Sequence, residues 1–388
     1  MITIPKSNAV LGFLFGMPTI VLGIYPDISG ISLLPVLIFF ILVLSKRKSI
    51  ILPVKLVVFI FLFIFFVTLS YFYSNKTDYS TYKLFMIYIK VIPLIFIPIL
   101  LGKDLPNFIN GYVLAGFISV LFLFSTLLLG ANSNALNNRI YIGKLNPIWI
   151  SRNLCELILL VGLILNNRKG AIIILLIGTP IIYLSGSKGP VLSMILVFFY
   201  SIFNQIFSLP KEKKIFSLII AILFFGSIMF FSFELINRLD TNSYLVQRFF
   251  RAVPDYARGE TYETSRVVVW PRTIFLIIEN FPKILFTGFG MGDFSFFYSG
   301  IIINDRIYPH NLILELIVEY GILFTLFIFA SIFNIWHNNN SSFKFLLLYF
   351  FLNSMVSGDL ILNEFIFFYL SCMTVSSICS ISNKAFNK

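Results

Sequence analysis

The stretch Tyr308-Pro-His-Asn-Leu-Ile-Leu-Glu-Leu-Ile-Val-Glu-Tyr-Gly321 lies where a long polar segment returns to apolar sequence. It carries His310, one of only two histidines, at the head of the apolar run. Upstream, Arg266-Val-Val-Val-Trp270-Pro-Arg272 leads into the glycine cluster Gly288-Phe-Gly290-Met-Gly292. Almost all of the remaining chain is compatible with hydrocarbon, so we expect a membrane-embedded functional site at this return.

Composition identifies a polytopic membrane protein. Apolar residues make up 58% of the 388 residues and charged residues only 12%, whereas a soluble domain averages about 25% charged residues. The mean hydropathy is +0.93. The net charge of +12 does not indicate nucleic-acid binding, because the sequence contains no contiguous soluble basic domain.

The hydropathy pattern predicts an all-α polytopic integral membrane protein, a single membrane domain over residues 1–388 with about 12 transmembrane helices. One large extracytoplasmic loop, residues 234–307, precedes the tenth span and contains a short amphipathic helix that ends near Ile278. The predicted spans lie at roughly 9–25, 31–45, 52–72, 82–101, 108–130, 149–166, 170–184, 189–208, 215–233, 308–336, 343–356 and 365–382.

Short lysine-rich loops set the predicted orientation. Lys46-Arg47-Lys48, Arg168-Lys169 and Lys211-Glu-Lys213-Lys214 fall on the side of both termini, which the positive-inside rule assigns to the cytoplasm. Nine of the eleven arginines fall on the opposite side. Arginine holds phosphate bidentately, so the extracytoplasmic surface suits an anionic headgroup. Anchoring of these arginines to lipid phosphates is the alternative.

The residues after His310 could carry chemistry. Asn311, Glu315 and Glu319 are spaced by four and share one helix face. Carboxylates at membrane depth are costly unless they face a cavity or a cation, so they are candidates for function. An ion pair with arginine that locks the helix is the alternative for both glutamates. For His310 the alternative is a capping or interfacial role.

Three further turns are predicted to converge on the same face. Ser185-Gly-Ser-Lys188-Gly-Pro190 presents a lysine that could reach a phosphate, Ser151-Arg152-Asn153 begins an inward helix, and Ser357-Gly-Asp359 could add a carboxylate. The two histidines lie on opposite sides and no Asp-x-Asp pair occurs, so we expect neither a metal site nor a cofactor.

Together these motifs resemble the signature of the O-antigen polymerase and O-antigen ligase superfamily, in its polymerase-like Wzy type. The residues that carry the resemblance are Arg266-x-x-x-Trp270, the glycine turn and Pro309-His310-Asn311-x-x-x-Glu315-x-x-x-Glu319-Tyr-Gly321. The match is specific over roughly 263–328 and looser at the Lys188 and Asp359 turns.

The resemblance implies a metal-independent extracytoplasmic glycosyltransferase that uses an undecaprenyl-diphosphate-linked oligosaccharide. It implies that His310 activates the acceptor hydroxyl, with Glu315 beside it as a catalytic residue. The diphosphate would be held by Arg266, Lys188, Arg152 and Arg272, with Asn311, Glu319 and Asp359 in support. The turn that usually reads Ser-Arg-Gly reads Ser-Lys188-Gly here. The lysine keeps the positive charge but lacks the planar guanidinium that binds phosphate bidentately.

A polymerase that extends a lipid-linked repeat unit, of O-antigen or capsule type, is favoured over a ligase that transfers the glycan to a lipid A core. A flippase for lipid-linked glycans is the alternative from another class. The expected location is the inner (plasma) membrane, multi-pass, with the site facing the periplasm or outside and both termini cytoplasmic. Expected partners are the lipid bilayer, a chain-length regulator and a flippase, but no nucleic acid.

Overall fold

The computed structural model describes residues 7–18, 21, 33–45, 54–129, 146–210, 213, 215, 217, 266–300 and 308–386. Regular structure in these ranges is helical, and no strand occurs among them. The all-α prediction therefore holds for this part of the chain. Of the predicted outer loop, residues 234–265 and 301–307 lie outside the described ranges, as does almost all of the predicted span 215–233.

The helices are connected largely by short turns within each described range. In chain order they are α1 (Ser7–Gly16), α3 (Leu34–Ser45), α4 (Val54–Phe72), α5 (Asp78–Met86), η2 (Ile87–Val91), α6 (Ile92–Leu101), η3 (Gly102–Asp104), α7 (Leu105–Leu128), α8 (Pro147–Leu159), η4 (Leu160–Ile164), α9 (Arg168–Ser185), α10 (Lys188–Phe207), α13 (Arg266–Glu279), α14 (Phe281–Phe286), α15 (Phe294–Ser299), α16 (Leu312–Tyr320), α17 (Ile322–His337), α18 (Phe343–Ser354), η7 (Ile361–Asn363) and α19 (Phe365–Phe386).

Within the described residues, five helical stretches are long and apolar enough to cross a membrane, which fits a multi-pass membrane protein. They are Val54–Phe72, Asp78–Leu128, Pro147–Ile164, Arg168–Ser185 and Lys188–Phe207. Shorter apolar helices of 10–17 residues accompany them. The total of twelve spans stays a prediction.

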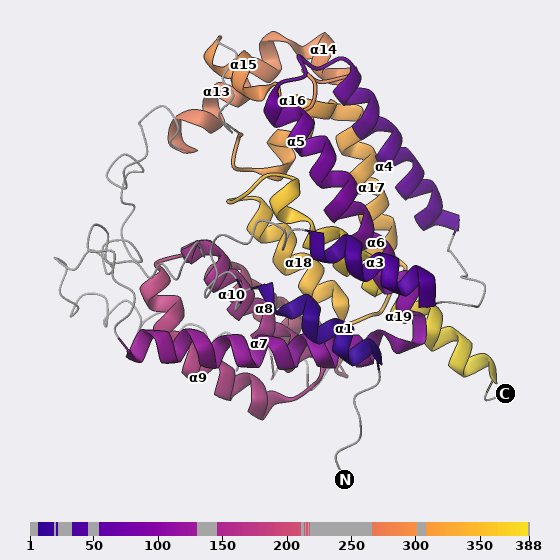
Figure 1. Ribbon diagram of the computed structural model, residues 1–388, viewed down its shortest axis with the longest axis vertical. Coiled ribbons are helices and arrows are strands. Elements are labelled where there is room, and N and C mark those ends of the chain that lie inside the picture. Colours follow the sequence, from indigo (N-terminus) through magenta and orange to yellow (C-terminus); the bar gives the residue numbers. More distant parts are fainter. Residues whose placement is uncertain are drawn as a thin grey trace.

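The stretch from Asp78 to Leu128 changes direction near Gly102. This glycine has a φ of +54°, a left-handed conformation that ends α6. In Figure 1, α5 and α6 descend steeply, whereas α7 runs across the lower part of the molecule. The break falls between the predicted spans 82–101 and 108–130.

The prediction of one helix over 308–336 is wrong, because the chain forms α16 and α17 instead. Gly321 separates them with a φ of +91°, and a side-chain carbon there would lie 2.9 Å from the backbone carbonyl of Phe286. Only glycine tolerates both that conformation and that approach. Helix α16, which carries Glu315 and Glu319, is therefore a short unit distinct from helix α17.

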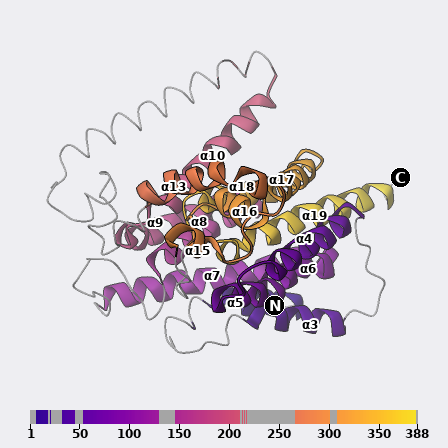
Figure 2. The same ribbon diagram turned by 90° about the horizontal axis from the view of Figure 1, so that it is seen from above.

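An aromatic core joins helices from opposite ends of the chain. The ring of Phe63 in α4 lies 6.4 Å from that of Phe324 in α17 and 5.0 Å from that of Phe367 in α19, measured between centroids. Helix α19 also packs along α6, as the view from above shows (Figure 2). This frame supports α16 through its direct successor α17.

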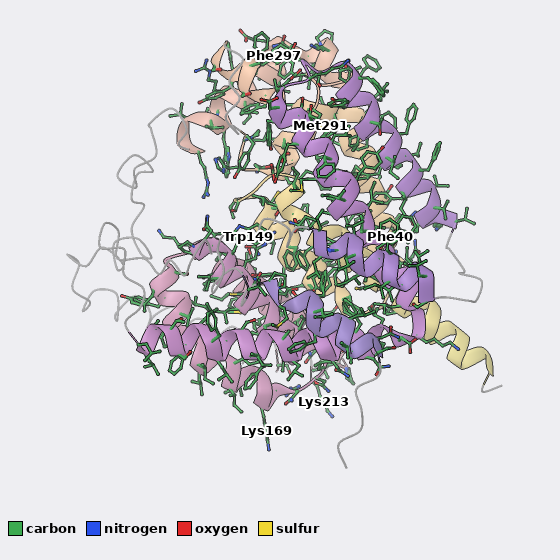
Figure 3. All side chains as sticks on the ribbon, in the orientation of Figure 1. Phe40, Trp149, Lys169, Lys213, Met291 and Phe297 are labelled. Carbon is green, nitrogen blue, oxygen red and sulfur yellow. The ribbon has the colours of Figure 1, made fainter. Side chains whose placement is uncertain are left out.

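Helices α13, α14 and α15 gather beside α16 at one end of the molecule (Figure 1). Helix α13 lies where the sequence predicted a short amphipathic helix: Val269 and Thr273 are buried, whereas Ile274, Phe275 and Ile278 are exposed. Figure 3 places Met291 and Phe297 in this end group. The group brings Arg266 and Trp270 to the same end as the His310 segment.

Candidate functional site

The His310 segment is held on both sides by hydrogen bonds. The indole Nε1 of Trp270 donates to the Pro309 carbonyl at 2.8 Å, and the Asn311 amide donates to the Met355 carbonyl at 3.1 Å. The Asn311 side-chain oxygen also caps α16 by accepting from the backbone N–H groups of Ile313 and Leu314, at 3.0 and 3.1 Å. Asn311, predicted as a supporting residue, therefore fixes where α16 begins.

His310 itself has a φ of +56°. A non-glycine residue in this left-handed region stores backbone strain, and such residues cluster at functional sites. The imidazole is partly exposed, and its ring centroid lies 4.3 Å from that of Tyr308. The bonds to Pro309 and Asn311 hold the strained residue in place at the head of α16.

Lys188 and Arg266, both predicted to bind a diphosphate, line one cavity of about 240 Å³. Lys188 is the first residue of α10, and Arg266 is the first residue of α13. Polar groups from Ser187 and Ser357 and apolar groups from Ile148, Leu192 and Val356 complete much of the wall. The lining residues include two cations and no carboxylate, so the cavity suits a ligand with an anionic part and an apolar part.

Residues 355–357 connect the cavity to the histidine. The Met355 carbonyl accepts from Asn311, and the next two residues, Val356 and Ser357, line the cavity. His310 precedes Asn311 in the chain, so the predicted base lies within a few residues of the cavity wall. Figure 3 labels Trp149 of α8, which is next in sequence to the lining residue Ile148.

Glu315 and Glu319 form a buried cluster with Lys83 of α5. The lysine Nζ binds the Glu315 carboxylate and lies 2.6 Å from Glu319 Oε2, and the exposed fractions of all three side chains are 0–1%. Glu315 also accepts from the Leu360 backbone N–H at 2.9 Å. This enclosure suits Glu315 for holding α16, and its predicted catalytic role stays a prediction. An ion pair with arginine that locks this helix was the alternative considered from the sequence. Such ion pairs are present, but the cation is Lys83.

Asp359 and Arg152 also bind protein groups. Asp359 is fully buried and accepts from the Tyr79 hydroxyl at 2.5 Å. Arg152 is 3% exposed, and its guanidinium donates to the Leu362 carbonyl at 3.0 Å and to Asn363 Oδ1 at 2.6 Å. These contacts fasten the turn over residues 357–364. They leave Arg152 outside the lining of the Lys188 cavity, so its diphosphate contact stays a prediction.

Arg272 lies further along α13 and is exposed, with its guanidinium 4.5 Å from the centroid of the Tyr298 ring. It is not among the residues that line the cavity of about 240 Å³. The four predicted diphosphate-binding residues thus separate into a pair in the cavity, Lys188 and Arg266, and a pair outside it.

The glycine cluster folds under α16 and is not a nucleotide-binding loop. Phe289 donates its backbone N–H to the Val318 carbonyl at 2.6 Å, and Gly290 donates to the Glu319 carbonyl at 3.2 Å. Asp293 ends the turn and accepts from the Asn75 backbone N–H at 2.8 Å. Burial raises the pKa of the Asp293 carboxyl, and the bond from Asn75 opposes that shift.

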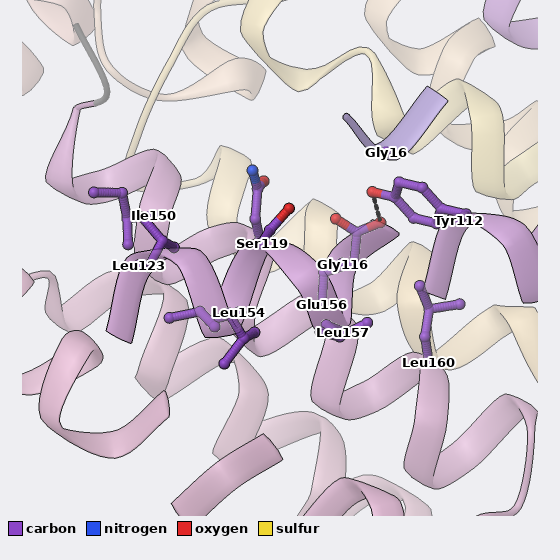
Figure 4. A pocket seen from close by; sticks show the side chains of 12 residues that line it. Gly16, Tyr112, Gly116, Ser119, Leu123, Ile150, Leu154, Glu156, Leu157 and Leu160 are labelled. Carbon is purple, nitrogen blue, oxygen red and sulfur yellow. Dashed lines mark hydrogen bonds between the residues drawn. The ribbon is translucent and has the colours of Figure 1, made fainter. Parts of the chain in front are cut away.

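A second cavity, of about 40 Å³, lies between α1, α7 and α8 (Figure 4). Glu156 lines it and accepts from the hydroxyl of Tyr112 at 3.0 Å and from that of Tyr369. This volume holds about one or two water molecules. It is therefore too small for a glycan or a lipid diphosphate.

Sequence reasoning missed Lys83 and Tyr79, although a signal for Lys83 was present. Lys83 and Lys90 are the only charged residues between Asp78 and Lys103, in a segment otherwise compatible with membrane. A lysine at such a position requires a buried partner, and the carboxylates of Glu315, Glu319 and Glu364, which also fall in apolar sequence, were available. The structure pairs Lys90 with Glu364 at 2.6 Å.

Part of the chain matches a known family. Residues 156–330 match the sequence model of a family described as O-antigen ligase. The matched region includes Lys188, Arg266 and His310, whereas Lys83 and Asp359 lie outside it. A search of curated proteins found no match.

Proposed function

We propose, from the match of residues 156–330 to the family described as O-antigen ligase, that this chain is a membrane glycosyltransferase of the O-antigen polymerase and ligase superfamily that takes its glycan from a polyprenyl diphosphate. The observation that carries the proposal is the cavity lined by Lys188 and Arg266. Its cations suit a diphosphate, and its apolar wall suits the first isoprene units of the lipid. A cavity with a purely structural role would have no reason to combine two cations with an apolar wall.

In the proposed reaction His310 takes the proton of an acceptor sugar hydroxyl. The oxygen attacks the anomeric carbon, the bond from that carbon to the diphosphate oxygen breaks, and its electron pair leaves with the polyprenyl diphosphate. Lys188 and Arg266 stabilise the charge that develops there. A positioned base contributes about 10²–10⁴-fold. A single displacement of this kind inverts the anomeric centre.

We favour the polymerase, which joins the glycan to a lipid-linked repeat unit, with the site open to the periplasm or outside of the inner membrane. The polymerase-like motif at Ser357-Gly-Asp359 supports this choice. The ligase is the second candidate, because the matching family is described by that activity. A ligase would use the same donor cavity and differ in the acceptor.

The flippase alternative receives less support. Its cations should line the centre of the membrane, whereas Lys188 and Arg266 begin their helices and lie at helix ends. The most apolar stretch that carries buried lysines, from Asp78 to Leu128, uses Lys83 in ion pairs within the protein.

Gel analysis of the surface polysaccharide of a deletion strain tests these functions. A single repeat unit on the lipid A core is expected, because a lost polymerase leaves the ligase active. A core without glycan, together with accumulated lipid-linked polymer, would identify the ligase instead. Normal ladders would exclude both enzymes, and repeat units trapped on the cytoplasmic face would identify the flippase.

A further inference from the structure

Helix α5 contacts both segments that frame the candidate site. Lys83 binds Glu315 and Glu319 on α16, where the distance to Glu319 is 2.6 Å. One helical turn earlier, Tyr79 donates to Asp359 in the turn over residues 357–364 at 2.5 Å. The same turn donates the Leu360 N–H to Glu315 at 2.9 Å. Helix α5, helix α16 and the turn thus meet at one buried polar cluster.

Stability alone does not account for this cluster. Taking charges out of water costs several kcal/mol per ion, and apolar residues of similar volume are often equally stabilising. One lysine faces two buried carboxylates, and among the described residues Glu319 Oε1 is buried without a hydrogen-bond partner. Charge-assisted hydrogen bonds are directional, whereas apolar contacts are not. The bonds of the cluster therefore fix the rotation of α16 relative to α5 and the turn.

Helix α16 and the turn over residues 357–364, which the cluster holds together, adjoin the predicted base and the diphosphate cavity respectively. Helix α16 begins at Asn311, directly after His310. The turn begins beside Val356 and Ser357, which line the diphosphate cavity. A rotation of α16 or a shift of the turn would therefore change the distance between the predicted base and the leaving group.

We propose that Lys83, Glu315 and Glu319, here called the carboxylate clamp, are positioning residues that set the distance between His310 and the diphosphate cavity. This inference rests on the proposed function. Misplacement by about 1 Å costs roughly 100-fold in rate for reactions that depend on positioning. The clamp should therefore affect turnover and leave donor binding by Lys188 and Arg266 nearly unchanged.

The first test removes all three charges together. The variant Lys83→Met/Glu315→Gln/Glu319→Gln leaves no unpaired buried charge, so it is expected to fold. Purified protein in detergent is assayed for binding of undecaprenyl diphosphate and for kcat with lipid-linked repeat units. We expect binding within about twofold of wild type and kcat lower by at least about tenfold. Lys55→Met, the same change at an exposed lysine of α4, is the matched control and should behave as wild type.

The second test separates positioning from proton transfer by Glu315. Glutamine at 315 still accepts from Lys83 and from the Leu360 N–H, so Glu315→Gln should lose no more than about threefold in kcat and keep the pH profile of wild type. If Glu315→Gln lost one limb of the pH profile and about 100-fold in kcat, Glu315 would be a catalytic residue and the clamp proposal would be wrong.

The remaining outcomes also support or contradict the clamp proposal. Wild-type kcat in the folded triple variant would overturn the proposal, and so would equal loss of binding and turnover. If the triple variant does not fold, Lys83→Arg is measured instead, because arginine retains the charge but changes the distance from α5 to the two glutamates. A lowered kcat with intact binding supports the clamp. Full kcat, or failure of this variant to fold, overturns it. Absence of transfer by the wild-type protein with any acceptor would refute the proposed function itself, independently of these variants.

Discussion

The cavity at Lys188 and the clamp at Lys83 use the same kinds of residue in opposite ways. In the clamp, the lysine lies against two glutamates, and all three side chains are at most 1% exposed. In the cavity, Lys188 and Arg266 line a space of about 240 Å³, and no carboxylate occurs among the described residues of its lining. The clamp encloses its cation within the protein, whereas the cavity places two cations in the wall of a volume that a ligand can fill.

This difference separates structural from functional charge in a membrane protein. Any charged residue in an apolar segment is a candidate for function, and by that criterion Lys83 and Lys188 are equal. Their surroundings distinguish them: a fully buried position against two glutamates indicates a holding role, and a position in a cavity wall indicates a binding role. The predictions below test this distinction at single residues.

The largest effect is expected at His310, beside the cavity. His310→Ala and His310→Gln should abolish polymer, a loss of at least about 100-fold, because neither residue takes a proton. His310→Asn is the sharper variant, since asparagine tolerates the left-handed backbone. Ladder length and protein level in membranes are measured together. Full-length polymer from His310→Asn or His310→Gln would reduce the histidine to a capping residue.

A smaller loss is expected from exchanging the two cations of the cavity. Arg266→Lys should lower kcat/KM by about 30-fold, because an ammonium does not reproduce the bidentate contact with phosphate. Lys188→Arg should equal or exceed wild type. Transfer rates with a lipid-linked donor measure both. Wild-type activity of Arg266→Ala would show that this arginine only anchors α13.

A carboxylate placed in the cavity should make it resemble the clamp. Ser357→Asp is expected to weaken binding of undecaprenyl diphosphate by about tenfold, since the added charge pairs with the cations and repels the ligand. Ser357→Asn has nearly the same shape and no charge, so its affinity should stay near wild type. Equal weakening by both variants would mean that volume, and not charge, limits binding.

The smallest effect is expected at Lys90, which is paired with Glu364 at 2.6 Å but is itself 22% exposed. Lys90→Gln keeps a hydrogen-bond donor for Glu364, so stability should fall by no more than about 1 kcal/mol. Turnover should stay within about threefold of wild type. The thermal midpoint and kcat are compared with those of Lys55→Met. A loss as large as that of the triple clamp variant would extend the clamp to this second pair.

The sequence predicted what depends on residue type and local order. Apolar runs indicated the helical class, and the motif around His310 and Arg266 indicated the superfamily. It did not predict that Lys83 pairs with Glu315 and Glu319, because these residues are 232 and 236 positions apart. It also missed the division at Gly321, since that break arises from close packing against Phe286.

The other predicted residues show the same limit. Arg152 was predicted to bind the diphosphate and Asp359 to support the site, and the structure adds contacts with Asn363 and Tyr79 that the sequence did not predict. A turn motif identifies a side chain that can bind an anion or a cation. Whether another part of the protein already occupies that side chain depends on contacts between distant helices.

The long separation between Lys83 and its partners has a consequence for biogenesis. Helix α5 is synthesised well before α16, and at about 5–20 residues per second the ribosome needs on the order of ten seconds or more to make the 236 intervening positions. During that interval the lysine resides in the translocation machinery without its glutamates, where a charged residue at membrane depth costs about 3 kcal/mol. We therefore expect insertion of α5 to be completed only after α16 has been synthesised, which couples the assembly of the two halves of the chain.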